Sequence, residues 1–515
     1  SGGAIVMGSY ANDDTGSQAI IIGTNVNGII SGGNATFSGN SASYGEGGAI
    51  LMFSAVDNGN TGEQSIDIAA DATFTDNIAG YNGGAIFMYS DADSGNAGEQ
   101  SIYIEGYATF VGNKADGGTT YYGHYYPGLY GNGGAIFMYS GANDGDSVAN
   151  VGHTGDQTID IGGDATFRNN ISEGDDGGAI YIETHSDHGN SGYQIIDIGG
   201  NATFEDNEAG DNGGAIYMFS EAYYGDTGNQ SIEIGGDGIE IGGDANFKTN
   251  IAGDGGGAIY MRSVAGFSGA DDGNTGKQTI DINGDGTFEA NIASYGAGGA
   301  ISMYSDADDG YTGSQTIDID GDATFTGNTA GNHGGAITMY SRASQGQTGV
   351  QYIYLGDGIT FDANTPSSSA IKMSNSDSAG DPLEITLAFV ANVSIGSPTL
   401  NIISNQSGDL YYIVLLASDA APTAADVIAG GLGIDAGTTG VSAGRLAIVT
   451  MSTLDAMTEY KVYVVVVDGL DQTLNSGVTD LSINGTDTDT TVPTLSPITA
   501  SAISGTGATL EFTTS

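Results

Sequence analysis

The chain lacks several residue types, and each absence excludes a class of protein. It has no cysteine and no tryptophan among its 515 residues, so disulfide bonds, thiolate metal sites and cysteine nucleophiles are excluded. Basic residues number only 9 against 63 acidic ones, which gives a formal net charge of −54. So few cationic side chains cannot neutralise phosphates, which excludes unaided binding to nucleic acid or to an anionic membrane.

Proline and long apolar runs are also scarce. The 7 prolines argue against a proline-rich disordered chain. The longest apolar runs, near residues 411–417 and 462–467, are too short to span a bilayer. Glycine, in contrast, supplies 89 residues without a triplet period, so the chain is not collagen-like. The first residues already lie inside a repeat, which predicts that the sequence is a piece of a longer protein.

Three short marks recur along the first two thirds of the chain, spaced by about 36 residues or more. Gly-Gly-Ala-Ile begins at Gly2, Gly47, Gly83, Gly133, Gly177, Gly213, Gly256, Gly298 and Gly334. A glutamine follows a turn at Gln18, Gln64, Gln100, Gln157, Gln194, Gln230, Gln278, Gln315 and Gln351. Phe-x-x-Asn begins at Phe37, Phe74, Phe110, Phe167, Phe204, Phe247, Phe288, Phe325 and Phe361.

Each mark belongs to a short predicted strand. Apolar residues alternate after Gly-Gly-Ala, as at Ile86 and Met88, and nine of the 11 methionines occupy this one slot. A period of two indicates a strand with one buried face. Three such strands cannot bury their apolar faces alone, whereas stacked copies form a continuous core. The sequence therefore predicts an all-β protein whose main part is a parallel β-helix of about nine or ten coils.

The turn residues agree with this fold. Paired glycines permit the positive φ angles that corners require. The asparagine of each Phe-x-x-Asn tolerates a left-handed turn and can hydrogen-bond to its copies above and below, while each phenylalanine stacks on the next. We interpret these repeated residues as architecture rather than as catalytic groups.

The pairing of Gly-Gly-Ala-Ile with Phe-x-x-Asn resembles the repeat signature of the chlamydial polymorphic membrane proteins and related bacterial surface proteins. The resemblance covers residues 1 to about 373. It implies a right-handed β-helix displayed outside the cell, as an adhesin or an autotransporter passenger. We assign residues 1–380 to this repeat domain.

The remaining third has a different pattern. Residues 381–486 carry longer apolar strands, such as 410–415 and 460–466, and are similar to bacterial fibronectin type III-like modules, which are immunoglobulin-like β-sandwiches. Residues 389–392 fit either the last strand of the helix or the first strand of this sandwich. Residues 487–515 read as a linker and the first strands of a second, incomplete sandwich module.

Outward positions are the candidate binding sites. An aromatic stripe on the first strand includes Tyr89, Tyr139, Tyr217, Tyr304 and Tyr340. It could pack against a loop, contact a neighbouring subunit or stack on sugar rings. A long insertion places a second aromatic group, predicted to bind a partner, at Tyr121, Tyr122, Tyr125, Tyr126 and Tyr130.

An acidic row on the second strand is the candidate metal site. It contains Asp67, Asp160, Asp197, Asp281 and Asp318. Stacked carboxylates repel one another and attract cations, so the row either holds Ca²⁺ or forms a solvated acidic surface. The segment His185-Ser186-Asp187-His188 is a weaker metal candidate, in a predicted loop. No other cofactor is expected.

These features predict a non-enzymatic extracellular protein of a bacterial surface, without direct membrane insertion. Our first hypothesis is a fibre subunit that self-associates head to tail. The alternative is an adhesin that recognises a glycan or a host surface. A polysaccharide-acting enzyme is a remote third possibility, since the basic residues are scattered and the acidic ones follow the repeat instead of breaking it at one place.

Overall fold

The structure is a computed structural model. It describes residues 3–26, 29–117, 131–142, 152–236, 242–266, 273–308, 310–344, 346–349, 351–355, 359–366, 370–377, 385–391, 399–404, 408–430, 433–441, 447–451, 459–468, 479–484, 499–504 and 507–511.

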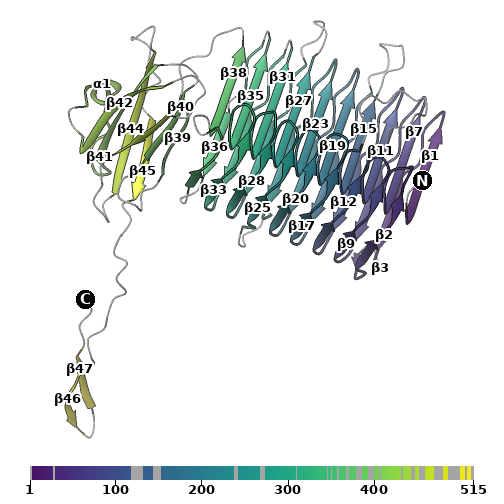
Figure 1. The fold of residues 1–515 in the computed structure, drawn as a ribbon, viewed down its shortest axis with the longest axis horizontal. Coiled ribbons are helices and arrows are strands. Elements are labelled where there is room, and N and C mark those ends of the chain that lie inside the picture. Colours follow the sequence, from purple (N-terminus) through teal and green to yellow (C-terminus); the bar gives the residue numbers. More distant parts are fainter. Residues whose placement is uncertain are drawn as a thin grey trace.

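The strands of successive coils stack along one axis and form four long parallel sheets, which together make up the predicted β-helix (Figure 1). The first sheet has ten strands, β1 (Ile5–Ala11), β7 (Ile50–Val56), β11 (Ile86–Ala92), β15 (Ile136–Ala142), β19 (Ile180–Ser186), β23 (Ile216–Ala222), β27 (Ile259–Ala265), β31 (Ile301–Ala307), β35 (Ile337–Ala343) and β38 (Ile371–Asp377). The second sheet has nine, each starting at the repeated glutamine: β2 (Gln18–Ile22), β8 (Gln64–Ile68), β12 (Gln100–Ile104), β16 (Gln157–Ile161), β20 (Gln194–Ile198), β24 (Gln230–Ile234), β28 (Gln278–Ile282), β32 (Gln315–Ile319) and β36 (Gln351–Leu355).

The third sheet carries the phenylalanines on nine strands: β5 (Ala35–Ser38), β9 (Ala72–Thr75), β13 (Ala108–Val111), β17 (Ala165–Arg168), β21 (Ala202–Glu205), β25 (Ala245–Lys248), β29 (Gly286–Glu289), β33 (Ala323–Thr326) and β37 (Ile359–Asp362). The sequence predicts three strands per coil, but the structure has a fourth strand of two residues after the asparagine. So short a strand leaves no period in the sequence, which is why it was not predicted. These short strands are β6 (Ser41–Ala42), β10 (Ile78–Ala79), β14 (Lys114–Ala115), β18 (Ile171–Ser172), β22 (Glu208–Ala209), β26 (Ile251–Ala252), β30 (Ile292–Ala293) and β34 (Thr329–Ala330). A small hairpin, β3 (Thr24–Val26) and β4 (Ile29–Ser31), interrupts the first coil.

Like residues lie above like residues in the core. Phenylalanine rings from Phe37 to Phe361 stack with centroids 4.7–5.0 Å apart and interplanar angles of at most 9°. This distance equals the spacing of neighbouring strands. Isoleucine and methionine fill the interior beside them. The vertical registry predicted from the repeat is therefore confirmed.

The asparagine ladder is present and runs through the corner after the phenylalanines. In a typical link, Asn207 donates from its backbone N and its Nδ2 to Oδ1 of Asn250, and the same Nδ2 donates to the carbonyl of Phe167. The sequence suggested that the asparagine adopts the left-handed conformation, but it does not. The residue before it does, for example Asp206 with a φ of 55°.

The two glycines of Gly-Gly-Ala-Ile serve different purposes. The first has a positive φ, 64° at Gly213. The second lies against the backbone of the next coil, so that a Cβ on Gly214 would meet the carbonyl oxygen of Gly257 at 2.1 Å. Conformational freedom accounts for the first glycine and lack of space for the second.

The C-terminal part forms two antiparallel sheets that share one core. The strands are β39 (Ile385–Ala391), β40 (Thr399–Ser404) and β43 (Ala447–Thr450) in one sheet, and β42 (Asp435–Val441), β41 (Gly408–Leu416), β44 (Glu459–Asp468) and β45 (Thr479–Asn484) in the other. Leu400 of the first sheet and Val464 of the second belong to the same cluster of buried residues. The ambiguous segment 389–392 overlaps β39, which pairs with β40 and so belongs to this sandwich.

Two further elements complete the described chain. Helix α1 (Ala424–Ala429), which was not predicted from the sequence, begins with a capping box between Thr423 and Asp426. Its Val427 packs on the outer face of β41 and β44. Strands β46 (Thr499–Ser504) and β47 (Gly507–Glu511) form an antiparallel pair. Among the residues that the structure describes, no helix has the length and apolar character needed to cross a membrane.

Candidate functional site

The outer face of the first sheet carries two columns of stacked aromatic residues. The second residue of each strand forms one column, with Phe87, Phe137, Tyr181 and Tyr217 in successive coils. The fourth residue forms the other, which we call the outer column: Phe53, Tyr89, Tyr139, Glu183, Phe219, Arg262, Tyr304 and Tyr340.

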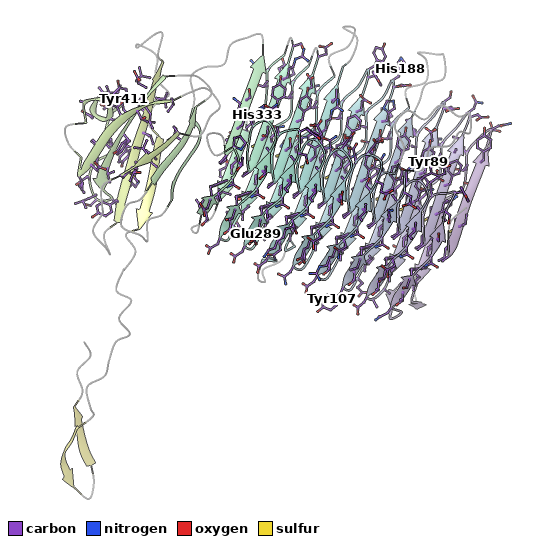
Figure 2. All side chains as sticks on the ribbon, in the orientation of Figure 1. Tyr89, Tyr107, His188, Glu289, His333 and Tyr411 are labelled. Carbon is purple, nitrogen blue, oxygen red and sulfur yellow. The ribbon has the colours of Figure 1, made fainter. Side chains whose placement is uncertain are left out.

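Most of the predicted aromatic stripe is buried. Tyr89, Tyr139 and Tyr217 retain 3, 9 and 3% of their surface and belong to a compact aromatic cluster. Figure 2 labels Tyr89 on the first sheet. Tyr304 and Tyr340 are partly exposed. That the stripe binds a partner therefore stays a prediction, and it applies mainly to Tyr304 and Tyr340. Tyr121, Tyr122, Tyr125, Tyr126 and Tyr130 lie outside the described residues.

The predicted acidic row is continuous over five coils. Asp160, Asp197, Glu233, Asp281 and Asp318 are aligned one per strand, whereas Tyr103 separates Asp67 from them. Burial raises the pKa of Asp160 and of Asp318, and repulsion from Asp281 adds to the effect at Asp318. No group of three histidine or acidic side chains suited to a metal ion occurs within the described ranges.

We predict that this row responds to ionic strength more than to calcium itself. Each strand offers one carboxylate, whereas Ca²⁺ takes 6–8 oxygen ligands. Sodium chloride should therefore raise the melting temperature as much as calcium chloride of equal ionic strength, because both screen the repulsion. Thermal melts of the protein, first stripped with a chelator, measure this. A higher melting temperature in calcium chloride than in sodium chloride of the same ionic strength would instead support specific calcium sites.

One strand, β19, breaks the pattern of the first sheet. Its sequence Ile-Tyr-Ile-Glu-Thr-His-Ser replaces the repeated methionine with Ile182, the outer-column ring with Glu183 and the repeated serine with Thr184. The Tyr181 hydroxyl donates to Glu183 Oε2 at 2.5 Å. Burial raises the pKa of Glu183, and the bond from Tyr181 opposes this shift.

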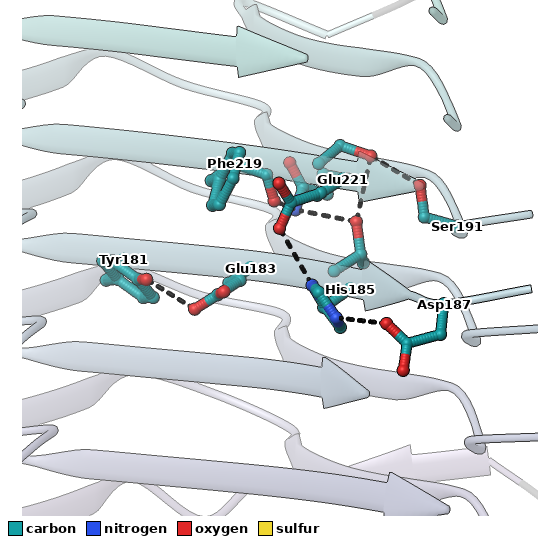
Figure 3. A network of polar contacts seen from close by, with 10 residues as sticks. Tyr181, Glu183, His185, Asp187, Ser191, Phe219 and Glu221 are labelled. Atoms are coloured by element: carbon teal, nitrogen blue, oxygen red, sulfur yellow. Dashed lines mark hydrogen bonds and ion pairs between the residues drawn. The ribbon is translucent and has the colours of Figure 1, made fainter. Parts of the chain in front are cut away.

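His185 bridges two carboxylates beside Glu183. Its Nε2 lies 3.1 Å from Asp187 Oδ1 and its Nδ1 lies 3.0 Å from Glu221 Oε2 on β23 (Figure 3). Burial alone would lower the pKa of His185, but the hydrogen bonds to Asp187 and Glu221 outweigh it and raise the pKa to about 10. The histidine is thus a cation that joins adjacent coils. It lies on a strand, not in the predicted loop, and both ring nitrogens are engaged by carboxylates.

The same coil interrupts the interior glutamine ladder. Elsewhere each Nε2 donates to Oε1 of the previous glutamine, as Gln230 does to Gln194 at 2.8 Å. Gln194 keeps the bond to a carbonyl of the next strand, here Phe219, but donates to Thr184 Oγ1 in place of Gln157. Gln157 Oε1 is consequently buried without a hydrogen-bond partner in the described structure. The threonine at position 184 therefore alters the hydrogen bonds of the core beneath the surface network of Glu183 and His185.

A second unpaired group suggests a stabilising substitution. Interior serines usually pair with a threonine of the preceding coil, as Ser90 does with Thr61 at 2.5 Å. Ser140 Oγ has no partner among the described residues, and Ala97 occupies the position equivalent to Thr61. We expect Ala97→Thr to raise the free energy of unfolding by ~1 kcal/mol, since a buried hydroxyl pair is formed. Ala97→Val, similar in size but without the hydroxyl, is the control in a denaturant titration, and an equal gain for both would contradict the explanation.

Asp176 replaces an amide in a third ladder. Its backbone N donates to Asn132 Oδ1 at 2.8 Å, and its Oδ1 accepts from the backbone N and the Nδ2 of Asn212 at 2.8 and 3.0 Å. Burial raises the pKa of Asp176 to about 7, although the bonds from Asn212 oppose the shift. Burial thus favours the neutral carboxyl of Asp176, whereas the hydrogen bonds from Asn212 favour the carboxylate and only partly offset burial.

Asp176 should therefore make stability depend on pH. The unfolded chain releases this proton near pH 3.8 and the folded chain near pH 7, so the contribution of Asp176 to stability declines as the pH rises through this window. We expect Asp176→Asn to remove that decline and to stabilise the protein by ~2 kcal/mol at pH 8, a value reduced because the side chain is partly exposed. Urea unfolding at pH 5 and pH 8 measures the difference. The exposed neighbour Asp211→Asn is the control; an equal response of both variants would contradict this role of Asp176.

Most basic side chains of the helix are engaged between coils. Arg168 pairs with Glu205, Lys248 with Glu289 at 3.3 Å, and Lys114 with Glu173 at 2.5 Å. Arg342 pairs with Asp306 at 3.1 Å, and Arg262 lies over aromatic rings. These cations neutralise neighbouring carboxylates and are not gathered around one reacting centre.

A solvent-open groove of about 420 Å³ runs along the turns before the second sheet. Asn60, Glu63, Asn96, Glu99 and His153 line it. Asn96 Oδ1 accepts the backbone N of His153, and His153 Nδ1 accepts that of Asn190, both at 2.9 Å. The groove presents amides and exposed carboxylates, which suit hydroxyl- or amine-bearing ligands.

Comparison with known proteins places the corner motif in one family. Residues 34–51, 71–88, 164–183, 201–218 and 322–338 match the Chlamydia polymorphic membrane protein repeat. Each matched segment extends from the phenylalanine strand through the asparagine to Gly-Gly-Ala-Ile. The resemblance drawn from the sequence is confirmed. No curated protein and no solved structure matches the chain.

Proposed function

Because the chain carries Chlamydia polymorphic membrane protein repeats along its β-helix, we propose that it is an extracellular, adhesin-like protein of a bacterial surface. The observation that supports this most directly is the recurrence of the family repeat at five corners of one continuous helix. The helix supplies a rigid, highly charged stalk, and the β19 coil supplies one place where the surface departs from the repeat.

We further propose that the protein is not an enzyme. Four basic groups, Lys114, Arg168, Lys248 and Arg342, pair with carboxylates of neighbouring coils. The ionised His185 is held between two carboxylates, which leaves it unsuited to act as a general base near neutral pH. The partly exposed groups at β19 suit recognition of a partner better than bond cleavage.

Surface display can be tested on intact cells that produce the protein. Antibodies against the repeat domain should label unpermeabilised cells, and proteinase K added outside should remove the label without lysing the cells. A periplasmic protein serves as the control and should stay protected. Labelling that appears only after permeabilisation would refute surface display.

Assembly into a fibre is the second candidate function. At one end of the stack the sandwich strand β39 contacts β36, while β1, at the other end, pairs in the described chain with β7 alone. A parallel edge of this kind can accept another chain. If copies join head to tail, light scattering should show a mass that grows with concentration. A constant monomer mass would contradict fibre formation.

A further inference from the structure

Glu183 leaves an interval in the outer column where a ring would otherwise stand. Neighbouring rings of this column lie 5.2 Å apart at Phe53–Tyr89 and 4.9 Å apart at Tyr89–Tyr139. Glu183 pairs in register with Tyr139 on one side and Phe219 on the other. These two residues are thus separated by two strand spacings, roughly 10 Å. A narrow carboxylate fills less of this interval than a phenol ring would.

The carboxylate of Glu183 is held in this interval by one hydrogen bond. Tyr181 fixes Oε2 by its hydrogen bond of 2.5 Å (Figure 3). Glu183 and Phe219 both keep part of their surface exposed to solvent. A planar group entering from outside would therefore meet the carboxylate between two aromatic side chains.

The molecule itself shows which planar group the column accepts. On the other side of Phe219, the guanidinium carbon of Arg262 lies 4.9 Å from the Phe219 ring centroid and 5.8 Å from that of Tyr304. Arg262 thus occupies a ring position and is stabilised by cation–π attraction. The Glu183 interval offers comparable aromatic walls and adds an anion.

Charge around the interval favours a cation. The three carboxylates of Glu183, Asp187 and Glu221 lie near the two cations His185 and Arg262, and the chain as a whole carries −54. A guanidinium can bind a carboxylate through two parallel hydrogen bonds and stack on aromatic faces, whereas an ammonium is a strongly hydrated point charge. The chemistry therefore selects arginine over lysine.

We propose that the interval between Tyr139 and Phe219, with Glu183 as counter-ion, binds an arginine side chain of a partner protein. This inference rests on the proposed adhesin-like function and names the chemistry of its partner. A guanidinium in this interval restores the aromatic column and forms an ion pair with Glu183. Binding of arginine would explain why the sequence of β19 departs from the repeat.

Calorimetric titration of the full chain tests the proposal. The probe is the capped tripeptide Gly-Arg-Gly, compared with its lysine and citrulline counterparts. The arginine peptide should bind about tenfold more tightly than either, because lysine lacks the planar fork and citrulline lacks the charge. Equal heats for the three peptides would mean nonspecific attraction to an acidic protein and would overturn the proposal.

Two variants locate the site. Glu183→Tyr, which restores the ring, should abolish binding while the melting temperature stays at or above that of the wild type. Glu183→Gln keeps the shape and should weaken binding by about tenfold, so it decides the matter if the tyrosine variant fails to fold. Asp281→Asn, in the distant acidic row, is the matched control and should bind normally. Wild-type affinity in Glu183→Gln would overturn the proposal, whereas the cell-labelling experiment tests surface display independently.

Discussion

Replacing Asn207 with alanine is expected to lower the free energy of unfolding by ~3–5 kcal/mol, a large share of the stability of a folded domain. Asn207 is fully buried. Its Nδ2 donates to Asn250 Oδ1 and to the Phe167 carbonyl, and its Oδ1 accepts from the backbone N and Nδ2 of Asn170. Alanine would remove these four hydrogen bonds from a buried site, and the loss of buried hydrogen bonds without access to water is costly.

The neighbouring Asn201 provides a matched control for Asn207. It occupies an exposed turn of the same coil, where its Oδ1 accepts the backbone N of Asp244 at 2.8 Å. Water can replace that bond, so Asn201→Ala should cost only about 1 kcal/mol. Denaturant titrations compare the two variants. Similar losses at both positions would show that burial does not set the strength of the asparagine ladder.

Gly214→Ala is expected to destabilise the protein by several kcal/mol or to prevent folding. The added Cβ would meet the carbonyl oxygen of Gly257 at 2.1 Å and the backbone N of Ile251 at 2.7 Å. Both atoms belong to the backbone of adjacent coils, so no side-chain rotation relieves the clash, and overpacking of this kind costs more than the usual ~1–3 kcal/mol.

Gly16→Ala is the control for this substitution. A Cβ at Gly16 has no atom within 4 Å, and alanine reduces the entropy of the unfolded chain, so its stability should change by less than about 1 kcal/mol. Melting temperatures and soluble yields of the two variants give the comparison. A Gly214→Ala protein as stable as the wild type would show that the coils can separate locally to admit a methyl group.

The sequence predicted the parts of the fold that repetition encodes. The methionine slot, the phenylalanine stack and the glutamine position each recur nine times, and only vertical stacking gives every copy the same environment. The short fourth strand and helix α1 were missed, because two residues carry no period and a six-residue helix sits among strand-like segments. The left-handed residue was assigned one position too late, since aspartate, glycine and alanine all occupy it and leave no common mark.

The candidate site was only half visible in the sequence. Glu183 and Thr184 depart from the repeat, and this departure was the available signal, whereas the sequence indicated only a weak metal site that included His185. The ion pair between His185 and Glu221 joins residues 36 positions apart. Its recognition requires the register between β19 and β23, which insertions of variable length obscure until the coils are aligned.

The asparagine ladder of the Phe-x-x-Asn corners and the interior glutamine ladder run in opposite senses. The asparagines of Phe-x-x-Asn donate to the coil that follows, as Asn170 does to Asn207, whereas the interior glutamines other than Gln194 donate to the coil that precedes, as Gln100 does to Gln64. Side-chain amide dipoles aligned in one sense would add up along the stack, but here the two rows largely cancel. Further coils can therefore be added without accumulating a net axial polarity, and the reach of such a stalk can evolve by simple duplication of its unit.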